Sequence, residues 1–326
     1  MPLNESNPKP SSRVEVVPHT DAGERLDQVA ARLFPEYSRA RLQQWIQSGN
    51  LLVNGEPTKA KHKVRGGETL SLEPIVEPQG DWLAQDLPLN IVYEDEHILV
   101  LNKGANAVVH PAAGNASGTV LNALLHHCPD LINLPRGGIV HRLDKDTTGL
   151  MVVAKTLTAH QDLVAQLQQR RVGRHYQAVV VGLVDAEGKV KTHIGRHPRQ
   201  RKKMAVLSNG GKEAITHYQV VRRFACHSHV ALKLETGRTH QIRVHMQHIG
   251  HPLVGDPVYG GRARTQRRLS LELNEALKTF PRQALHAAKL ALIHPLTRQS
   301  MAWDAPMPED MSVLIDKLSS EGTIEQ

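Results

Sequence analysis

Short apolar or alternating runs recur through residues 89–307 and set the fold class. Runs at 91–93 and 98–101 flank a charged segment, which predicts a β-hairpin. The remaining patterns predict strands at 149–154, 176–181, 216–221 and 230–234, and helices at 120–127, 158–169, 239–248 and 283–290. Strands interspersed with helices and joined by tight turns favour an α+β fold with a mixed, largely antiparallel sheet over a doubly wound parallel one.

A smaller α/β unit precedes this region. Apolar residues at 26, 29, 30 and 33 share one helix face, and Ser38 is the expected N-cap of a second helix over 39–47. Strands are expected at 51–53 and 69–72. The expected organisation is a flexible tail at 1–21, a small domain at 22–76, a linker at 77–88, a main domain at 89–307 and a C-terminal tail at 308–326.

The charge and cysteine content narrow the class of partner. The chain has 326 residues and a formal charge of +8, which is typical of a polyanion binder although charge alone is a weak signal. Its two cysteines, Cys128 and Cys226, exclude a Cys-rich zinc module and a disulfide framework. The polar N-terminus lacks the apolar stretch of a signal peptide, and no run is long enough to span a bilayer. We therefore expect a cytoplasmic protein with no membrane partner, by default a monomer.

Two basic segments are candidate RNA contacts, with a solvated basic surface as the alternative for each. In the small unit, alternate basic residues on an extended stretch can follow a phosphate backbone. A loop at 196–203 is also strongly basic. The candidate residues are Arg39, Arg41, Lys59, Lys61, Lys63, Arg199, Arg201, Lys202 and Lys203. The Arg-Leu-Asp start, the Ser-Arg-x-Arg helix opening and the Val-Asn-Gly turn of the small unit resemble the S4 domain, an RNA-binding module.

The segment 137–150, GGIVHRLDKDTTGL, concentrates reactive side chains in one loop between apolar runs. Loops held by a rigid scaffold often carry function, but spacing alone also fits a charged turn with a local Arg–Asp pair. The segment resembles the active-site motif of the RluA family of pseudouridine synthases. That resemblance implies that Asp144 is the catalytic carboxylate, while Asp146 is more consistent with a structural role.

Other segments extend the resemblance over about residues 15–315. The run 174–178 resembles the strand whose tyrosine, here Tyr176, stacks on the target base. The run 236–246 resembles the motif whose basic residue pairs with the catalytic aspartate; we assign the pairing to Arg238, with Arg243 as second choice. The segments 251–253 and 255–260 continue the match, while Gly104 departs from it, since proline is expected after Lys103.

The leading S4-like unit makes the chain most similar to the RluD-type members. They modify the helix 69 hairpin loop of large-subunit ribosomal RNA, so the implied partner is 23S ribosomal RNA or a large-subunit assembly intermediate. The family's fold is a mixed, largely antiparallel sheet with flanking helices and loops around a central cleft.

The implied chemistry suits these residue types. Isomerisation breaks the N1–C1′ bond of uridine and forms a C5–C1′ bond, and a carboxylate beside C1′ can act as a nucleophile, stabilise positive charge or remove a proton. A neighbouring arginine favours the ionised carboxylate and orients it. The base must leave its stack, for which Tyr176 provides a platform while Arg142 braces the vacated space. No cofactor is expected, because no redox or group transfer occurs.

Three competing hypotheses use the same residues. A non-catalytic RNA-binding or ribosome-assembly factor has no use for a buried Asp–Arg pair. A glycoside hydrolase requires two supported carboxylates, and Asp146 lacks such support. A metal site built from His240, His245, His248 and His251 is disfavoured, because their spacing does not place three on one helix face. We therefore expect no metal.

Overall fold

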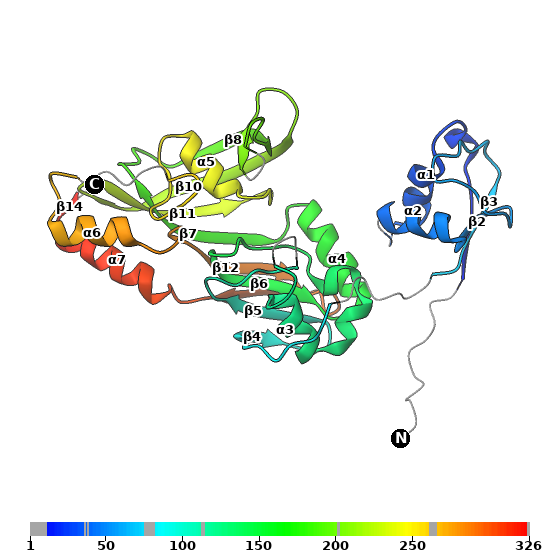
Figure 1. Cartoon of the computed structure of the whole chain (residues 1–326), viewed down its shortest axis with the longest axis horizontal. Coiled ribbons are helices and arrows are strands. Elements are labelled where there is room, and N and C mark those ends of the chain that lie inside the picture. Colours follow the sequence, from blue (N-terminus) through cyan, green and yellow to red (C-terminus); the bar gives the residue numbers. More distant parts are fainter. Residues whose placement is uncertain are drawn as a thin grey trace, which may run out of the picture. The chain divides into compact units, whose positions relative to one another are not determined.

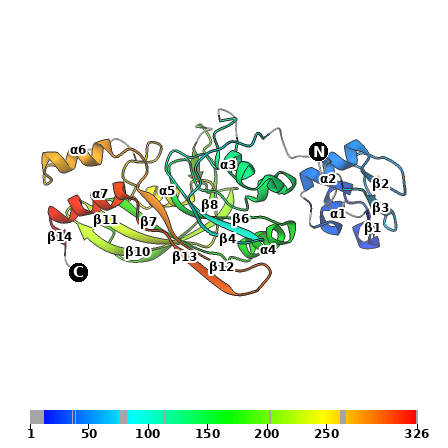
Figure 2. The ribbon, with the colours of Figure 1, turned by 90° about the horizontal axis from the view of Figure 1, so that it is seen from below.

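The computed structural model describes residues 12–35, 37, 39–74, 82–111, 115–200, 203–260 and 266–324. The chain divides into two compact units, residues 1–78 and 79–326, drawn in Figures 1 and 2. Among the described residues, no helix combines the length and apolar character needed to cross a bilayer.

The first unit combines two helices with a three-stranded antiparallel sheet of order β1-β3-β2. Its elements are β1 (Arg13–Val16), the 3-10 helix η1 (His19–Asp21), α1 (Leu26–Leu33), α2 (Arg39–Ser48), β2 (Leu51–Val53) and β3 (Thr69–Leu72). Leu26, Val29 and Ala30 are buried in its core and Leu33 packs against it, as the helical spacing of these residues predicts. The predicted tail is wrong for residues 13–21, because β1 pairs with β3 and Val17 is buried. The proposed N-cap Ser38 lies outside the described residues.

The second unit is built on an eleven-stranded sheet with the path β4-β5-β6-β12-β7-β11-β10-β8-β9; β13 pairs with β12 and β14 with β10. The strands are β4 (Ile91–Glu94), β5 (Ile98–Lys103), β6 (Thr148–Ala154), β7 (Gly173–Val181), β8 (Gly188–Arg196), β9 (Met204–Val206), β10 (Lys212–Phe224), β11 (His227–Leu234), β12 (Leu285–Ile293), β13 (Ser300–Asp304) and β14 (Thr323–Ile324). Only the β12–β6 pair is parallel among the described strands, so the predicted mixed, largely antiparallel sheet is confirmed.

Helices cover both faces of this sheet (Figure 2). Leu99 packs in the core that contains α3 (Val120–His127), whereas the next residue, Val100, packs in the core that contains α4 (Leu157–Gln168). Successive strand residues point to opposite faces, so these two helices lie on opposite sides of β5. The short 3-10 helices η2 (Pro129–Asn133) and η3 (Pro135–Gly138) follow α3.

The same alternation holds on β7. Ala178 packs with α5 (Gln241–His248), and Val179 packs with α6 (Leu271–Thr279) and α7 (Glu309–Ser320). The predicted C-terminal tail at 308–326 is therefore wrong: Met311 and Leu314 of α7 are buried, and β14 pairs with β10.

Two other expectations fail. The helix predicted at 283–290 is the strand β12, whose neighbours on the sheet path are β6 and β7. Its short apolar run does not distinguish a buried strand from a buried helix. The predicted linker is wrong for residues 82–88, because Asn122 of α3 donates to the carbonyl oxygen of Leu83 at 2.7 Å and accepts from the backbone of Gln85 at 3.0 Å.

Candidate active site

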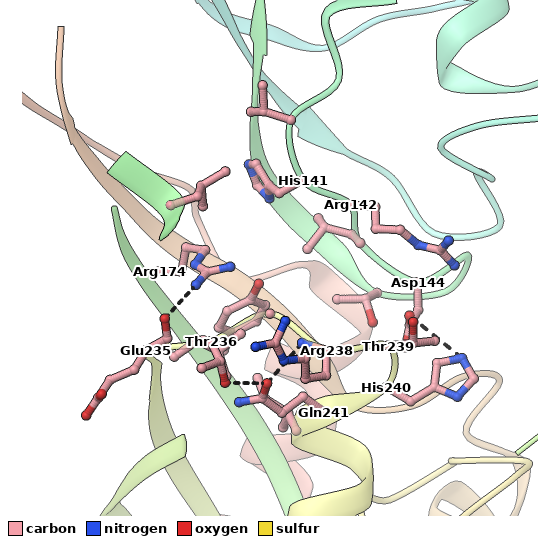
Figure 3. A pocket seen from close by; sticks show the side chains of 18 of the residues that line it. His141, Arg142, Asp144, Arg174, Glu235, Thr236, Arg238, Thr239, His240 and Gln241 are labelled. Atoms are coloured by element: carbon pink, nitrogen blue, oxygen red, sulfur yellow. Dashed lines mark hydrogen bonds and ion pairs between the residues drawn. The ribbon is translucent and has the colours of Figure 1, made fainter. Parts of the chain in front are cut away.

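A cleft of about 530 Å³ opens on the second unit where the segment 140–147, strand β7, the turn 235–240 and the start of α5 meet. Figure 3 shows Asp144 and His240 facing each other on one side of this cleft, and Arg174 and His141 on the other. The segments of the resemblance, far apart in sequence, therefore line one cavity.

Buried contacts fix the loop that carries Asp144. Leu143 is 5% exposed and packs in the core beneath the sheet, and the backbone N–H of Thr147 donates to the carbonyl oxygen of Asp144 at 3.1 Å. Gly149 follows with a φ of +113°, and a Cβ there would lie 2.3 Å from the carbonyl oxygen of Ala287. Only glycine fits this close approach, so the chain passes directly from the loop into β6.

Two buried basic side chains bind the backbone of the same loop. Lys103 donates from Nζ to the carbonyl oxygen of Lys145 at 2.8 Å and to two further carbonyl oxygens. Burial lowers the pKa of Lys103 to about 7, although Asp146 and Asp144 oppose that shift. Arg282 donates from Nη1 to the carbonyl oxygen of Asp146 at 3.3 Å. These contacts position the backbone on the C-terminal side of Asp144.

One guanidinium joins two carboxylates at the centre of the site. Arg243 of α5 donates from Nη1 to Oδ2 of Asp144 at 2.9 Å. Its other edge binds Asp256 twice, from Nε at 2.7 Å and from Nη2 at 2.9 Å. Asp256 also accepts the backbone N–H groups of Val258 and Tyr259, each at 2.9 Å. Asp256 therefore fixes the arginine, and the arginine fixes Asp144.

The electrostatics follow from burial and these pairings. Burial alone would lower the pKa of Arg243, but the hydrogen bonds to Asp256 and the charge of Asp144 outweigh it and raise that pKa. Burial likewise acts to raise the pKa of Asp256, and its bonds to Arg243 and two backbone N–H groups lower it overall. Both groups stay charged at neutral pH.

His240 and Tyr259 complete this side of the cleft. Nε2 of His240 lies 3.8 Å from Oδ1 of Asp144, and Nδ1 lies 2.9 Å from the hydroxyl oxygen of Tyr259. That hydroxyl oxygen accepts the backbone N–H of Met204 at 2.9 Å, and the Tyr259 ring lies 5.0 Å from the guanidinium carbon of Arg243. Burial lowers the pKa of His240, with Asp144 acting in the opposite direction. His240, which the sequence analysis named only within a disfavoured metal site, is thus a neighbour of Asp144.

Tyr176, the expected base platform, and Arg142 lie beside this centre. Tyr176 of β7 lines the cleft and is 7% exposed; burial raises the pKa of its hydroxyl. Arg142 is exposed, next to Leu143 at the rim. The structure therefore brings Asp144, Tyr176 and Arg142 together.

The expected pairing of Asp144 with Arg238 is wrong, and the second choice, Arg243, holds that position. Arg238 lies in the turn before α5, where its Nε donates to the carbonyl oxygen of Glu213 at 2.9 Å. Arg243 is on the buried face of the helix, three residues before the fully buried Met246. This three-residue spacing from an apolar residue could have been used to choose Arg243 from the sequence.

Some candidate RNA contacts are bound to other side chains, and others are exposed. In the first unit, Arg39 is bound to the buried Asp27 at 2.7 Å, and Arg41 stacks over Trp45. The expected extended stretch is wrong, because a turn closes from Lys59 to His62. The remaining candidates are Lys59, Lys61, Lys63 and Arg199, which are exposed, Lys203, which is half-buried, and Arg201 and Lys202, which lie outside the described residues.

Metal-type ligands gather at one place in the described part of the chain. Single ligand atoms of Glu94, His127 and Cys128 lie within 4.8 Å of one another. The ammonium group of Lys155 already binds Glu94 at 2.7 Å, and His127 binds its other oxygen at 2.7 Å. An ion pair network therefore accounts for this cluster.

Comparison with known proteins matches both units. A model of the RNA pseudouridylate synthase family matches residues 97–248, and a model of the S4 domain matches residues 24–70. A Pseudomonas aeruginosa protein described as ribosomal large subunit pseudouridine synthase D is 58% identical over 95% of this chain and 96% of its own. An Escherichia coli (strain K12) protein of the same description is 52% identical over 94% of each chain.

A solved structure, human RNA pseudouridylate synthase domain containing 4, aligns with a TM-score of 0.55 at 24% identity. The alignment covers 71% of this chain and 93% of the human chain. At that identity it supports the fold alone.

Proposed function

The chain belongs to the RNA pseudouridylate synthase family, and we propose from this premise that its substrate is large-subunit ribosomal RNA. The reaction is the isomerisation of uridine to pseudouridine. Relatives described as large-subunit enzymes match nearly the full length of both chains, S4-like unit included, which supports this substrate.

The observation that carries the catalytic assignment is the placement of Asp144. It is the carboxylate that lines the cleft while one of its oxygens is bound to the buried Arg243, and its side chain keeps 17% exposure. A fixed, accessible carboxylate beside an aromatic side chain suits reaction at C1′ of a flipped nucleotide. Asp144 is therefore the proposed catalytic residue, as nucleophile, electrostatic stabiliser or base.

Base flipping gives roles to two further residues. Tyr176 is the proposed platform for the flipped uracil, and stacking of this kind contributes about 1–3 kcal/mol per base. Arg142, which is exposed and lines the cleft, is proposed to brace the space that the base leaves. The isomerisation neither oxidises the substrate nor transfers a group between molecules, so we expect no cofactor.

The finer substrate choice rests on the S4-containing organisation. We propose the hairpin loop of helix 69 as the target, with 23S ribosomal RNA or a large-subunit assembly intermediate as partner. The S4-like unit would contact phosphates through Arg41, Lys59, Lys61 and Lys63, and the catalytic unit through the basic loop at 196–203. The proposed setting is the cytoplasm, and the proposed state is a monomer.

The test is tritium release from ribosomal RNA that carries tritium at uridine C5. The wild-type protein should release tritium, Asp144→Asn should not, and Asp146→Asn is the matched control in the same loop. Release by Asp144→Asn at the wild-type rate would rule out the assignment. Mapping pseudouridines in a strain that lacks the protein then checks the target: loss at positions outside helix 69 would refute the finer proposal.

A further inference from the structure

Arg174 is a buried cation without a carboxylate partner among the described residues. It is 7% exposed in β7, its Nε has no hydrogen-bond partner, and its Nη2 donates to the carbonyl oxygen of Glu235 at 3.2 Å. Figure 3 shows this bond, with the carboxylate of Glu235 turned away. That carboxylate binds Arg170 at 2.8 Å and His217 at 2.6 Å.

The charged and titratable groups around Arg174 do not compensate it. Burial, together with Arg174 itself, lowers the pKa of His141 to about 3, so that ring is neutral at pH 7. Burial lowers the pKa of Arg174; Tyr176 opposes that shift, and the nearby charge of Arg238 adds to it. Burying a charge without a partner is costly, and such a group is kept most readily where a ligand supplies the missing acceptor.

The position of Arg174 indicates which acceptor that is. Arg174 and Asp144 line the same cleft from opposite sides (Figure 3). Tyr176 lies close enough to both residues for their charges to affect its pKa. Burial is the largest effect and raises that pKa; Arg174 opposes the shift and Asp144 adds to it. A nucleotide with C1′ at Asp144 and its base over Tyr176 would therefore extend towards Arg174.

We propose that Arg174 donates hydrogen bonds to a carbonyl oxygen of the bound uracil and stabilises the negative charge that develops there. The inference rests on the proposed function. When the N1–C1′ bond breaks, its electron pair leaves with the uracil and spreads to the ring oxygens. The C5–C1′ bond then forms, C5 loses a proton and N1 gains one, so the composition is unchanged. A donor fixed at that oxygen acts where the charge appears.

A backbone phosphate is the other source of an anionic oxygen, and the structure disfavours it. Phosphates are bulky and strongly hydrated, whereas Arg174 as a whole residue is only 7% exposed. The exposed Arg142 at the rim is the better phosphate contact.

Gly237 gives an independent way to move Arg174. A Cβ at position 237 would lie 2.6 Å from Nη1 of Arg174, and the backbone there has no left-handed φ. Alanine is therefore compatible with the backbone but displaces the guanidinium. Gly237→Ala leaves the charge in the protein and changes its position.

The experiment measures single-turnover tritium release at saturating 23S RNA for the wild type, Arg174→Met, Arg174→Lys, Gly237→Ala and the surface control Arg222→Met on β10. The first two variants should slow release, Arg174→Met by about 10²–10³-fold, the usual effect of removing one such donor. The release rate of Gly237→Ala should also be lower than that of the wild type, and the release rate of Arg222→Met should equal it. The Kd for RNA should stay within about twofold of wild type, because the contact strengthens only as charge develops.

Two further measurements separate the alternatives. Loss of a phosphate contact in Arg174→Met would weaken RNA binding and reduce the slope of log Kd against log salt by about 0.7, and would overturn the proposal. A purely structural role would lower the unfolding temperature of Arg174→Met and leave the Gly237→Ala rate unchanged, and would also overturn it. Removal of an unpaired buried charge should instead keep or raise the unfolding temperature. Wild-type rates in all variants refute this inference alone, whereas no release by the wild type refutes the proposed function.

Discussion

Comparing Asp256→Asn with Asp144→Asn should separate the stability of the site from its chemistry. The side chain of Asp256 is fully shielded from solvent. It binds Arg243 through both oxygens and accepts hydrogen bonds from two backbone N–H groups. Asparagine removes the charge and turns an N–H group towards either the guanidinium or the backbone donors. Arg243, 5% exposed, would then rely on Asp144 alone.

The expected magnitude follows from this geometry. Removing one partner of a buried ion pair costs about 3–5 kcal/mol, because the other charge stays buried without compensation. For a unit of this size that corresponds to about 6–20 °C in unfolding temperature. Asp144→Asn should cost only about 1–2 kcal/mol, because Arg243 keeps both bonds to Asp256.

The assay compares urea unfolding and tritium release for both variants. Asp256→Asn should lose stability and activity, whereas Asp144→Asn should lose activity with little change in stability. Asp310→Asn is the matched control, since Asp310 also binds a buried arginine, Arg282, through both oxygens, but its side chain is 34% exposed. A stability loss for Asp256→Asn no larger than for Asp310→Asn or Asp144→Asn would refute the reasoning.

Three further predictions concern acid stability, the base platform and the first unit. Burial lowers the pKa of His227, His229 and His245 to about 4, so below pH 6.5 the unfolded chain binds protons that the folded chain does not. Stability should therefore fall as the pH drops from 7 to 5, by about 2 kcal/mol per histidine; urea unfolding should show a smaller drop for His245→Asn, and an equal drop contradicts the prediction. Tyr176→Leu should lower kcat/KM by about 5- to 150-fold through lost stacking, and Tyr176→Phe should lose far less; equal losses would exclude the platform role. Deleting residues 1–78 should weaken selection of large RNA while the second unit stays folded by circular dichroism; unchanged site choice and rate on assembled subunits would contradict it.

Long periodic segments were predictable from the sequence, and short apolar ones were not. The α1 and α3 helices carry apolar residues at helical spacing, and α3 also begins at a capping Thr119. The strand β12 has an apolar run that fits a helix equally well, and its place on the sheet path depends on distant partners. The burial of α7 likewise comes from contacts with residues far away in the chain, which no local pattern encodes.

Some residues of the active site were likewise predictable from the sequence, and others were not. Asp144 and Tyr176 lie in long motifs whose resemblance assigned them a place, and the structure puts both in one cleft. The choice between Arg238 and Arg243 depended on where α5 begins, which the prediction placed two residues early. Asp256, thirteen residues beyond Arg243, is recognised as its partner only when the chain folds back.

The charges of the cleft form a polarised arrangement. On one side, the carboxylates of Asp144 and Asp256 face the single guanidinium of Arg243, which leaves one net negative charge. On the other side, Arg174 is positive without a carboxylate partner in the described chain, and His141 is neutral. Breaking a glycosidic bond develops positive charge at the sugar and negative charge at the base. A substrate with its ribose at Asp144 and its base towards Arg174 would meet the complementary charge at both ends, so both groups would lower the same barrier.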